Sequence, residues 1–214
     1  MRPSLCFIAM CLFSAGLTAQ VMNEAPAAEE WTVSLNGTWE FAPEGSTEFK
    51  PASVPGFWGR SDHSTPPADV KAMQGWKSGT YRRSFSVPEG RTGVAIDFDM
   101  VRWGGEVFVN GKAAGSIDLG YTPLRVDVSA LVKPGDNVLE VRPRGWVTLP
   151  RADGKNISIP IGAGNWFGEK SAGIPDDVSL RFYDGAAIGD IRIIPTINGP
   201  ACRIETAVTT PGRA

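Results

Sequence analysis

The chain has 214 residues, of which 21% are charged, and its formal net charge is −2. This length allows one domain with a proper hydrophobic core, or one domain plus a fragment. The nearly balanced charge without a basic patch argues against nucleic acid as a partner. With 25 glycines and 17 prolines, the composition favours many short strands that are joined by tight turns.

The first residues have the pattern of a secretory signal. Arg2 supplies a positive charge, Leu5–Leu17 is an apolar run, and small residues precede a cut after Ala19. A membrane anchor is the alternative, but the run is too short to span a bilayer comfortably. The pattern predicts a signal peptide at residues 1–19, a secreted or periplasmic protein with no membrane span after removal of the signal, and a polar, flexible leader at residues 20–34.

Cysteine and histidine are too few for disulfides or for a zinc site of the usual kind. Cys6 and Cys11 leave with the signal peptide, so Cys202 stays alone. His63 is the single histidine of the chain, and one histidine with one cysteine cannot complete a zinc ligand set. We expect no metal and no cofactor.

From Leu35 onward the sequence has the turn signals and strand patterns of an all-β domain. Asn110-Gly111 predicts a two-residue hairpin turn, because a type I′ turn needs positive φ at both central residues. No segment keeps a 3.6-residue apolar period for three turns, and Asp127–Leu131 predicts one turn of helix at most. The expected strands lie at residues 35–41, 79–87, 93–101, 106–111, 124–131, 137–146, 177–183 and 188–197. Together they predict a β-sandwich.

Two long stretches, Arg60–Lys77 and Arg144–Lys170, are poor in strand signals. They are longer than the loops of compact domains usually are, and long loops on a rigid scaffold often hold binding sites. Trp76, Trp146 and Trp166 lie in or beside these loops. An indole face can stack on the apolar face of a sugar ring, whereas anchoring of the loops to the domain is the alternative interpretation.

Short motifs follow one another in a fixed order over Leu35–Pro195: LNGTWEF (35–41), VPGFW (54–58), GTYRRSF (79–85), VNGK (109–112), GYTP (120–123), LVKPGDN (131–137), AGI (172–174), DVSL (177–180) and IGDI (188–191). Their order and spacing resemble the N-terminal sugar-binding domain of glycoside hydrolase family 2, the β-galactosidase and β-glucuronidase group. The resemblance implies an antiparallel jelly-roll β-sandwich, galactose-binding-domain-like, over residues 35–197. Residues 198–214, where a strand pattern resumes, are expected to begin a second, immunoglobulin-like β domain that is otherwise missing. Trp39 and Trp58, which lie in two of these motifs, are interpreted as core packing.

The resemblance implies a non-catalytic role. Members of the family place the acid/base and the nucleophile on a later barrel domain, and a retaining glycosidase needs two carboxyl groups about 5–5.5 Å apart. Asp97, Asp99, Asp176 and Asp177 are better explained as solvated positions. We therefore expect no catalytic residue in this chain, and as partners a carbohydrate and, in a full-length enzyme, the catalytic barrel.

The loop before Ala172–Ile174 is the candidate substrate-binding segment. In the family this loop carries an acidic or amide residue that reaches the sugar site of the barrel, and here Asn165 is the nearest candidate, with Trp166 beside it. The loop is longer than the usual one of the family. His63 lies in a polar loop without a nucleophile motif and is interpreted as solvated.

Two other interpretations stay open. The chain can be a free-standing, lectin-like carbohydrate-binding module without hydrolase partner domains, or a purely structural adhesion domain. The strand pattern after residue 198 favours a fragment of a longer hydrolase over the free-standing module.

Overall fold

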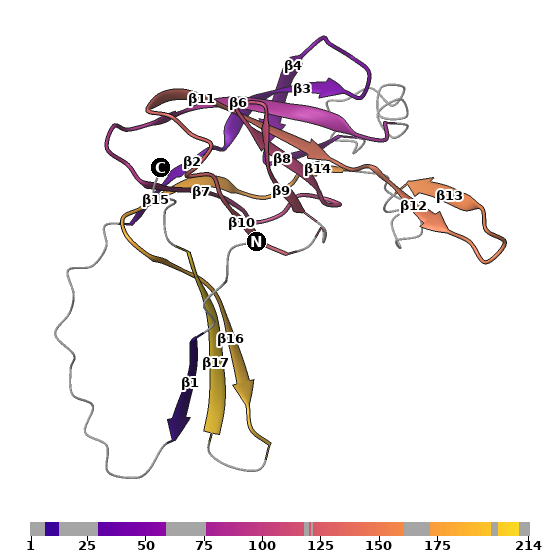
Figure 1. Cartoon of the computed structure of the whole chain (residues 1–214). Coiled ribbons are helices and arrows are strands. Elements are labelled where there is room, and N and C mark those ends of the chain that lie inside the picture. The colour runs from indigo at the N-terminus through magenta and orange to yellow at the C-terminus, as the bar shows by residue number, and fades with distance from the viewer. Residues whose placement is uncertain are drawn as a thin grey trace.

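The computed structural model describes residues 7–12, 30–58, 76–117, 120, 122–160, 172–197 and 201–209. Its body is a sandwich of two antiparallel sheets (Figure 1). The six-stranded sheet has the order β4 (Lys50–Val54), β3 (Gly37–Pro43), β6 (Gly79–Val87), β11 (Gly135–Pro143), β8 (Gly105–Val109) and β9 (Lys112–Ile117). The four-stranded sheet has the order β10 (Leu124–Asp127), β7 (Gly93–Phe98), β15 (Val178–Tyr183) and β2 (Trp31–Ser34). The predicted antiparallel, all-β sandwich is confirmed.

The core lies between the two sheets and follows the alternation of the strands. In β11 every second residue from Asn137 to Pro143 is buried, and Leu139 and Val141 are fully inside. Each buried aliphatic or aromatic side chain of this size stabilises the fold by about 1.5–3 kcal/mol relative to exposure. Trp39 and Trp58 are both buried in this core, so their interpretation as packing residues is confirmed.

The Asn110-Gly111 turn joins β8 to β9 as predicted. Asn110 has a φ of 52° and Gly111 a φ of 75°, which is the sign that a type I′ turn requires at both positions. The predicted single turn near Asp127–Leu131 is present as a hydrogen bond from Leu131 N to Val128 O of 2.8 Å. Among the described residues no helix is long and apolar enough to cross a membrane.

A hairpin corrects the prediction that Arg144–Lys170 is poor in strands. β12 (Trp146–Pro150) and β13 (Asn156–Pro160) pair antiparallel and project away from the sandwich (Figure 1). Their connection closes through Gly154, whose φ is +76°. Asp153-Gly154 is thus the local turn signal of this hairpin.

A separate three-stranded sheet, here called the arm, also projects from the sandwich (Figure 1). It consists of β1 (Phe7–Leu12), β17 (Ala201–Thr209) and β16 (Ala187–Pro195), in that order. The strand expected at 188–197 therefore belongs to the arm and not to the sandwich, whose last strand ends at Tyr183.

Strand pairing also moves the start of the sandwich. β2 pairs with β15, although its residues fall in the stretch predicted as leader, so the sandwich begins at Trp31. Phe7–Leu12 of the predicted signal peptide pairs with β17, whereas the rest of residues 1–29 lies outside the described residues, as do 198–200 and 210–214.

Candidate functional site

The start of the first predicted long loop and the end of the second lie side by side at one edge of the sandwich, here called the rim. β5 (Gly56–Trp58) ends where the first loop starts, and β14 (Ala172–Ile174) begins where the second loop stops. These two short strands pair directly, with Trp58 opposite Ala172. Residues about 115 positions apart in the chain are thereby neighbours, so loops that leave β5 and enter β14 share a common origin.

Gly173 makes this pairing possible. Its φ is +142°, and a Cβ at this position would lie 2.6 Å from the carbonyl oxygen of Gly56. The backbone also bonds to the 101–104 segment, with Arg102 N to Gly173 O at 2.9 Å and Gly173 N to Arg102 O at 3.0 Å. Gly173 thus holds three chain segments together where only a residue without a side chain fits.

A cluster of aromatic rings forms the floor of the rim. The Phe41 ring lies 5.3 Å from Trp58, 5.5 Å from Trp76 and 4.7 Å from Tyr81, measured between centroids. Aromatic pairs at such spacing add about 0.5–1.5 kcal/mol beyond the area that they bury. Trp76 is half-buried in this cluster, so its ring anchors the chain at this point.

The phenol of Tyr81 is buried against this floor. Burial raises the pKa of Tyr81 well above its ordinary value, because the charged phenolate would lose its hydration. An ideal Cβ on Gly173 would lie 3.1 Å from the Tyr81 hydroxyl. The hydroxyl therefore stays neutral and belongs to the structural base of the rim.

Arg102 brings a positive charge to the rim. Its guanidinium carbon lies 4.6 Å from the Trp103 ring centroid and 5.4 Å from that of Phe57. Stacking of this kind is attractive, because the planar guanidinium cation faces the negative face of the ring. Gly120 packs against the same segment, since its Cβ would lie 2.7 Å from the Cα of Trp103.

Arg144 lies between β11 and β12 and contacts the same part of the sandwich. Its Nη2 donates to the Ile117 carbonyl at 2.9 Å, and its backbone N donates to Gly104 O at 3.0 Å. Half-buried tryptophans beside an arginine can bind a sugar-like ring: the indoles offer apolar faces for stacking, and the guanidinium offers hydrogen-bond donors to hydroxyl groups. Sequence reasoning missed Arg102 and Arg144, because nothing local in either stretch indicates the neighbours that the fold brings to them.

The predicted substrate-binding residues Asn165 and Trp166 lie outside the described residues, and so does His63. The rim therefore fixes where their loop ends, at β14, but does not place their side chains. Their role stays a prediction.

Of the four acidic residues that were interpreted as solvated, Asp99 and Asp176 are exposed, whereas Asp97 and Asp177 have side-chain partners that the sequence did not reveal. Asp97, which was interpreted as solvated, is bound by Arg125 and Arg181 and is half-buried. Asp177 accepts a hydrogen bond from Asn36 Nδ2 at 2.8 Å. Among the residues that the structure describes, no group of three or more His, Cys, Asp or Glu side chains could hold a metal ion.

Comparison with known proteins identifies relatives of this sandwich. Residues 67–160 match the family profile described as glycosyl hydrolase 2 galactose-binding domain-like. An exo-β-D-glucosaminidase of Streptomyces avermitilis is 28% identical over 151 residues, which are 68% of this chain and 15% of that enzyme. A putative β-glucuronidase of Formosa agariphila is 27% identical over 130 residues, which are 54% of this chain and 13% of that protein.

Solved structures agree on the fold. A β-glucuronidase from Ruminococcus gnavus in complex with D-glucaro-δ-lactam superposes with a TM-score of 0.61 at 20% identity, covering 92% of this chain and 36% of that one. The same enzyme in complex with uronic deoxynojirimycin gives a TM-score of 0.60 at 20% identity, over 86% of this chain and 34% of that one. The chain thus spans about a third of these enzymes and a smaller part of the curated relatives.

Proposed function

We propose that the sandwich, in which residues 67–160 match the profile described as glycosyl hydrolase 2 galactose-binding domain-like, is the non-catalytic, carbohydrate-facing module of a longer family 2 glycoside hydrolase. The observation that supports the proposal is the rim, where the ends of both long loops meet beside stacked aromatic rings and two arginines. In this proposal the module packs on a catalytic barrel and forms one wall of its sugar pocket. Hydrolysis is left to the barrel.

Asn165 and Trp166 are proposed as the sugar contacts of this module. They belong to the segment between β13 and β14, and β14 is held at the rim by its pairing with β5. An amide group can donate to one sugar hydroxyl and accept from another, while an indole covers the apolar face of the ring.

The substrate class follows from the relatives only as a proposal. Their names describe enzymes that act on β-linked glucosamine and glucuronic acid derivatives. We propose that the hydrolase to which this module belongs acts on a β-galactoside, a β-glucuronide or a related glycan, and that it takes part in carbohydrate metabolism.

Secretion is a further part of the proposal. The N-terminal pattern supports a cut after Ala19 and a secreted or periplasmic location. Amino-terminal sequencing of the protein from its natural source should then read from Gln20. An intact Met1 terminus would contradict the proposed signal.

Binding can be tested directly with a matched pair of aromatic variants. Isothermal titration of the chain with glucuronate, galactose and mannose should show heat of binding for one of them. Trp166→Ala should abolish this heat, whereas Phe49→Ala should keep it, because the Phe49 ring packs on the Arg82 guanidinium, at 3.9 Å, and is not one of the aromatic rings of the rim. Equal binding by both variants would remove Trp166 from the site.

A free-standing carbohydrate-binding module is the second candidate function. The complete core of the sandwich favours it, whereas the arm favours a larger protein, since Ile191 and Ile193 are 60% and 63% exposed on one face and a patch of that kind usually has a partner. The length of the natural product decides between the two. A product much longer than 214 residues that hydrolyses a chromogenic β-glycoside, beside an inactive 214-residue chain, supports the module of a hydrolase.

A further inference from the structure

A series of ion pairs crosses the outer face of the four-stranded sheet. Glu30 binds Arg181, and Arg181 binds Asp97 through Nε and Nη2, each at 2.6 Å. The other carboxylate oxygen of Asp97 accepts a hydrogen bond from Arg125 Nε at 2.7 Å. The four residues come from β7, β10, β15 and the residue before β2, so the series runs over all the strands of the sheet.

The last member of the series reaches the arm. Arg125 Nη1 donates a hydrogen bond to the carbonyl oxygen of Ile188, at 3.2 Å, and Ile188 lies on β16. One guanidinium thus binds a carboxylate of the sandwich and a backbone group of the arm simultaneously. The planar guanidinium of arginine, with five donors in a fixed arrangement, suits this double contact.

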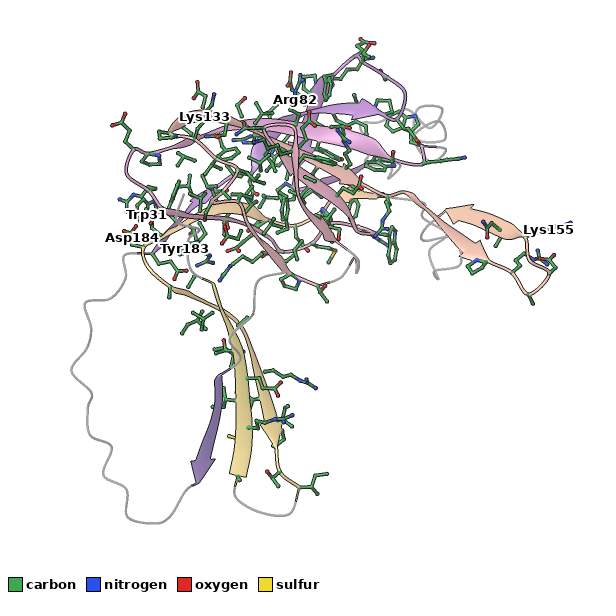
Figure 2. All side chains as sticks on the ribbon, in the orientation of Figure 1. Trp31, Arg82, Lys133, Lys155, Tyr183 and Asp184 are labelled. Carbon is green, nitrogen blue, oxygen red and sulfur yellow. The ribbon has the colours of Figure 1, made fainter. Side chains whose placement is uncertain are left out.

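The covalent connection alone does not fix the direction of the arm. β15 ends at Tyr183 and β16 begins at Ala187, so three residues join the two sheets. One of them, Gly185, has a φ of +78°. Figure 2 shows Tyr183 and Asp184 on the side of the sandwich where the arm begins. A short connection with a glycine permits rotation unless a second contact restrains it.

The surrounding cavity supports a mechanical role over a ligand site. A space of about 500 Å³ lies between sandwich and arm, and Leu124, Tyr183, Ile188 and Ala207 are among its lining residues. Three nitrogen atoms of each arginine already contact Asp97, Glu30 or Ile188. A ligand that entered the cavity would find these donors in use.

We propose that this series of ion pairs is a clamp that fixes the direction of the arm relative to the sandwich, with Arg125 as the residue that transmits the restraint. The side chain of Asp97 is only 16% exposed and that of Arg181 21%, so solvent screens these pairs less than it screens ordinary surface pairs. Any domain that continues from the arm would take its orientation from the clamp. The clamp itself does not depend on the proposed function.

Spin labels on the two parts of the full chain can measure the restraint. Lys112→Cys places one label on β9 of the sandwich, and Arg203→Cys places the other on β17 of the arm. The three native cysteines are replaced by serine. Double electron–electron resonance then gives the distribution of the distance between the labels, and circular dichroism checks that every variant is folded.

Arg125→Gln should broaden this distance distribution, because the contacts to Asp97 and Ile188 are lost together. Arg82→Gln is the matched control: its ion pair with Glu40 has the same 36% exposure of the arginine, and Figure 2 places Arg82 on the side of the sandwich away from the arm. The control should leave the distribution unchanged. Equal widths for folded Arg125→Gln and the labelled parent would overturn the proposal.

The effect of ionic strength on the distance distribution of the labelled parent tests the clamp without any substitution in it. Raising the ionic strength from about 0.01 M to about 1 M shortens the Debye length from about 30 Å to about 3 Å. The distribution of the labelled parent should broaden over this range, and that of the Arg125→Gln variant, where it folds, should not respond. A parent distribution that does not change with salt would overturn the clamp as an electrostatic restraint.

Discussion

Tyr183 makes the stability of the sandwich sensitive to alkaline pH. Its hydroxyl donates to Asp127 Oδ2 at 2.7 Å, and burial raises the pKa of Tyr183 to about 12 from an ordinary value of about 10. The folded state therefore holds this proton more tightly than the unfolded state. Its contribution is complete below about pH 10 and is lost as the pH rises towards 12.

Tyr183→Phe should flatten this alkaline loss of stability. Urea unfolding followed between pH 9 and about 12 should give a shallower decrease for the variant than for the parent, because the phenyl ring has no proton to lose. A residual decrease is expected, since burial also raises the pKa of Tyr81. An identical decrease in both proteins would show that Tyr183 ionises in the folded chain as it does when unfolded.

Gly173 offers a test of the rim by a single methyl group. Gly173→Ala should destabilise the fold by about 1–3 kcal/mol, because φ is +142° and the new Cβ would lie 2.6 Å from Gly56 O. Gly154→Ala is the control, since Gly154 has a positive φ of +76° with no atom within 4 Å of a Cβ. Chemical denaturation should therefore give a larger loss for Gly173→Ala than for the control.

At the scale of the elements, Asn137 joins two turns of the six-stranded sheet. It is 1% exposed and forms side-chain hydrogen bonds of 2.8–2.9 Å with Lys133, Gly135 and Asn110. The hairpin turn between β8 and β9 is thereby fixed to the turn before β11. A buried amide with several partners is costly to remove, because its partners then have no hydrogen bonds.

Asn137→Ala should lower the free energy of unfolding by about 2–4 kcal/mol, since each orphaned buried group costs about 1–3 kcal/mol. Asn156→Ala is the matched control on the exposed hairpin and should stay within about 0.5 kcal/mol of the parent. Thermal and urea unfolding measure both. A loss at Asn137 no larger than that at Asn156 would mean that water replaces the missing amide.

Local signals explain which elements could be predicted from the sequence. The Asn110-Gly111 hairpin was predicted correctly because two adjacent residues determine its turn. Strands β2 and β14 were missed because each is short and depends on a partner far away in the chain. The hairpin β12–β13 was missed because Asp153-Gly154 lies in a polar stretch whose flanks do not alternate clearly.

The candidate site was harder to predict than the strands, because it depends even more on contacts between residues far apart in the chain. The sequence indicated that long loops and tryptophans matter, but the rim depends on the pairing of β5 with β14 and on the bridge between Arg102 and Gly173. Both are contacts between residues at least 70 positions apart in the sequence, and no periodicity encodes them. Asp97 is a comparable case, since the alternation of β7 predicts an outward side chain but not the two arginines that meet it.

At the scale of the whole molecule, the stability of the C-terminal strands of the arm depends on whether the N-terminal segment is retained. β17 lies between β16 and β1, and Phe7–Leu12 supplies its second edge partner. If the signal peptide is removed after Ala19, β17 keeps only β16 as a partner. A two-stranded ribbon is marginally stable in water, and its exposed edge can accept another strand.

Removal of residues 1–19 should therefore loosen the arm without affecting the sandwich. Hydrogen exchange of the full chain and of a chain that starts at Gln20 should show faster exchange in β17 of the shorter chain. The amides of β11, at the centre of the six-stranded sheet, should exchange equally in both and serve as the internal control. A shorter chain whose β17 remains fully protected would contradict this loosening and would indicate that another strand or a second copy has taken the edge that β1 left. The mass of the shorter chain in solution then separates these two occupants, since only a second copy doubles it.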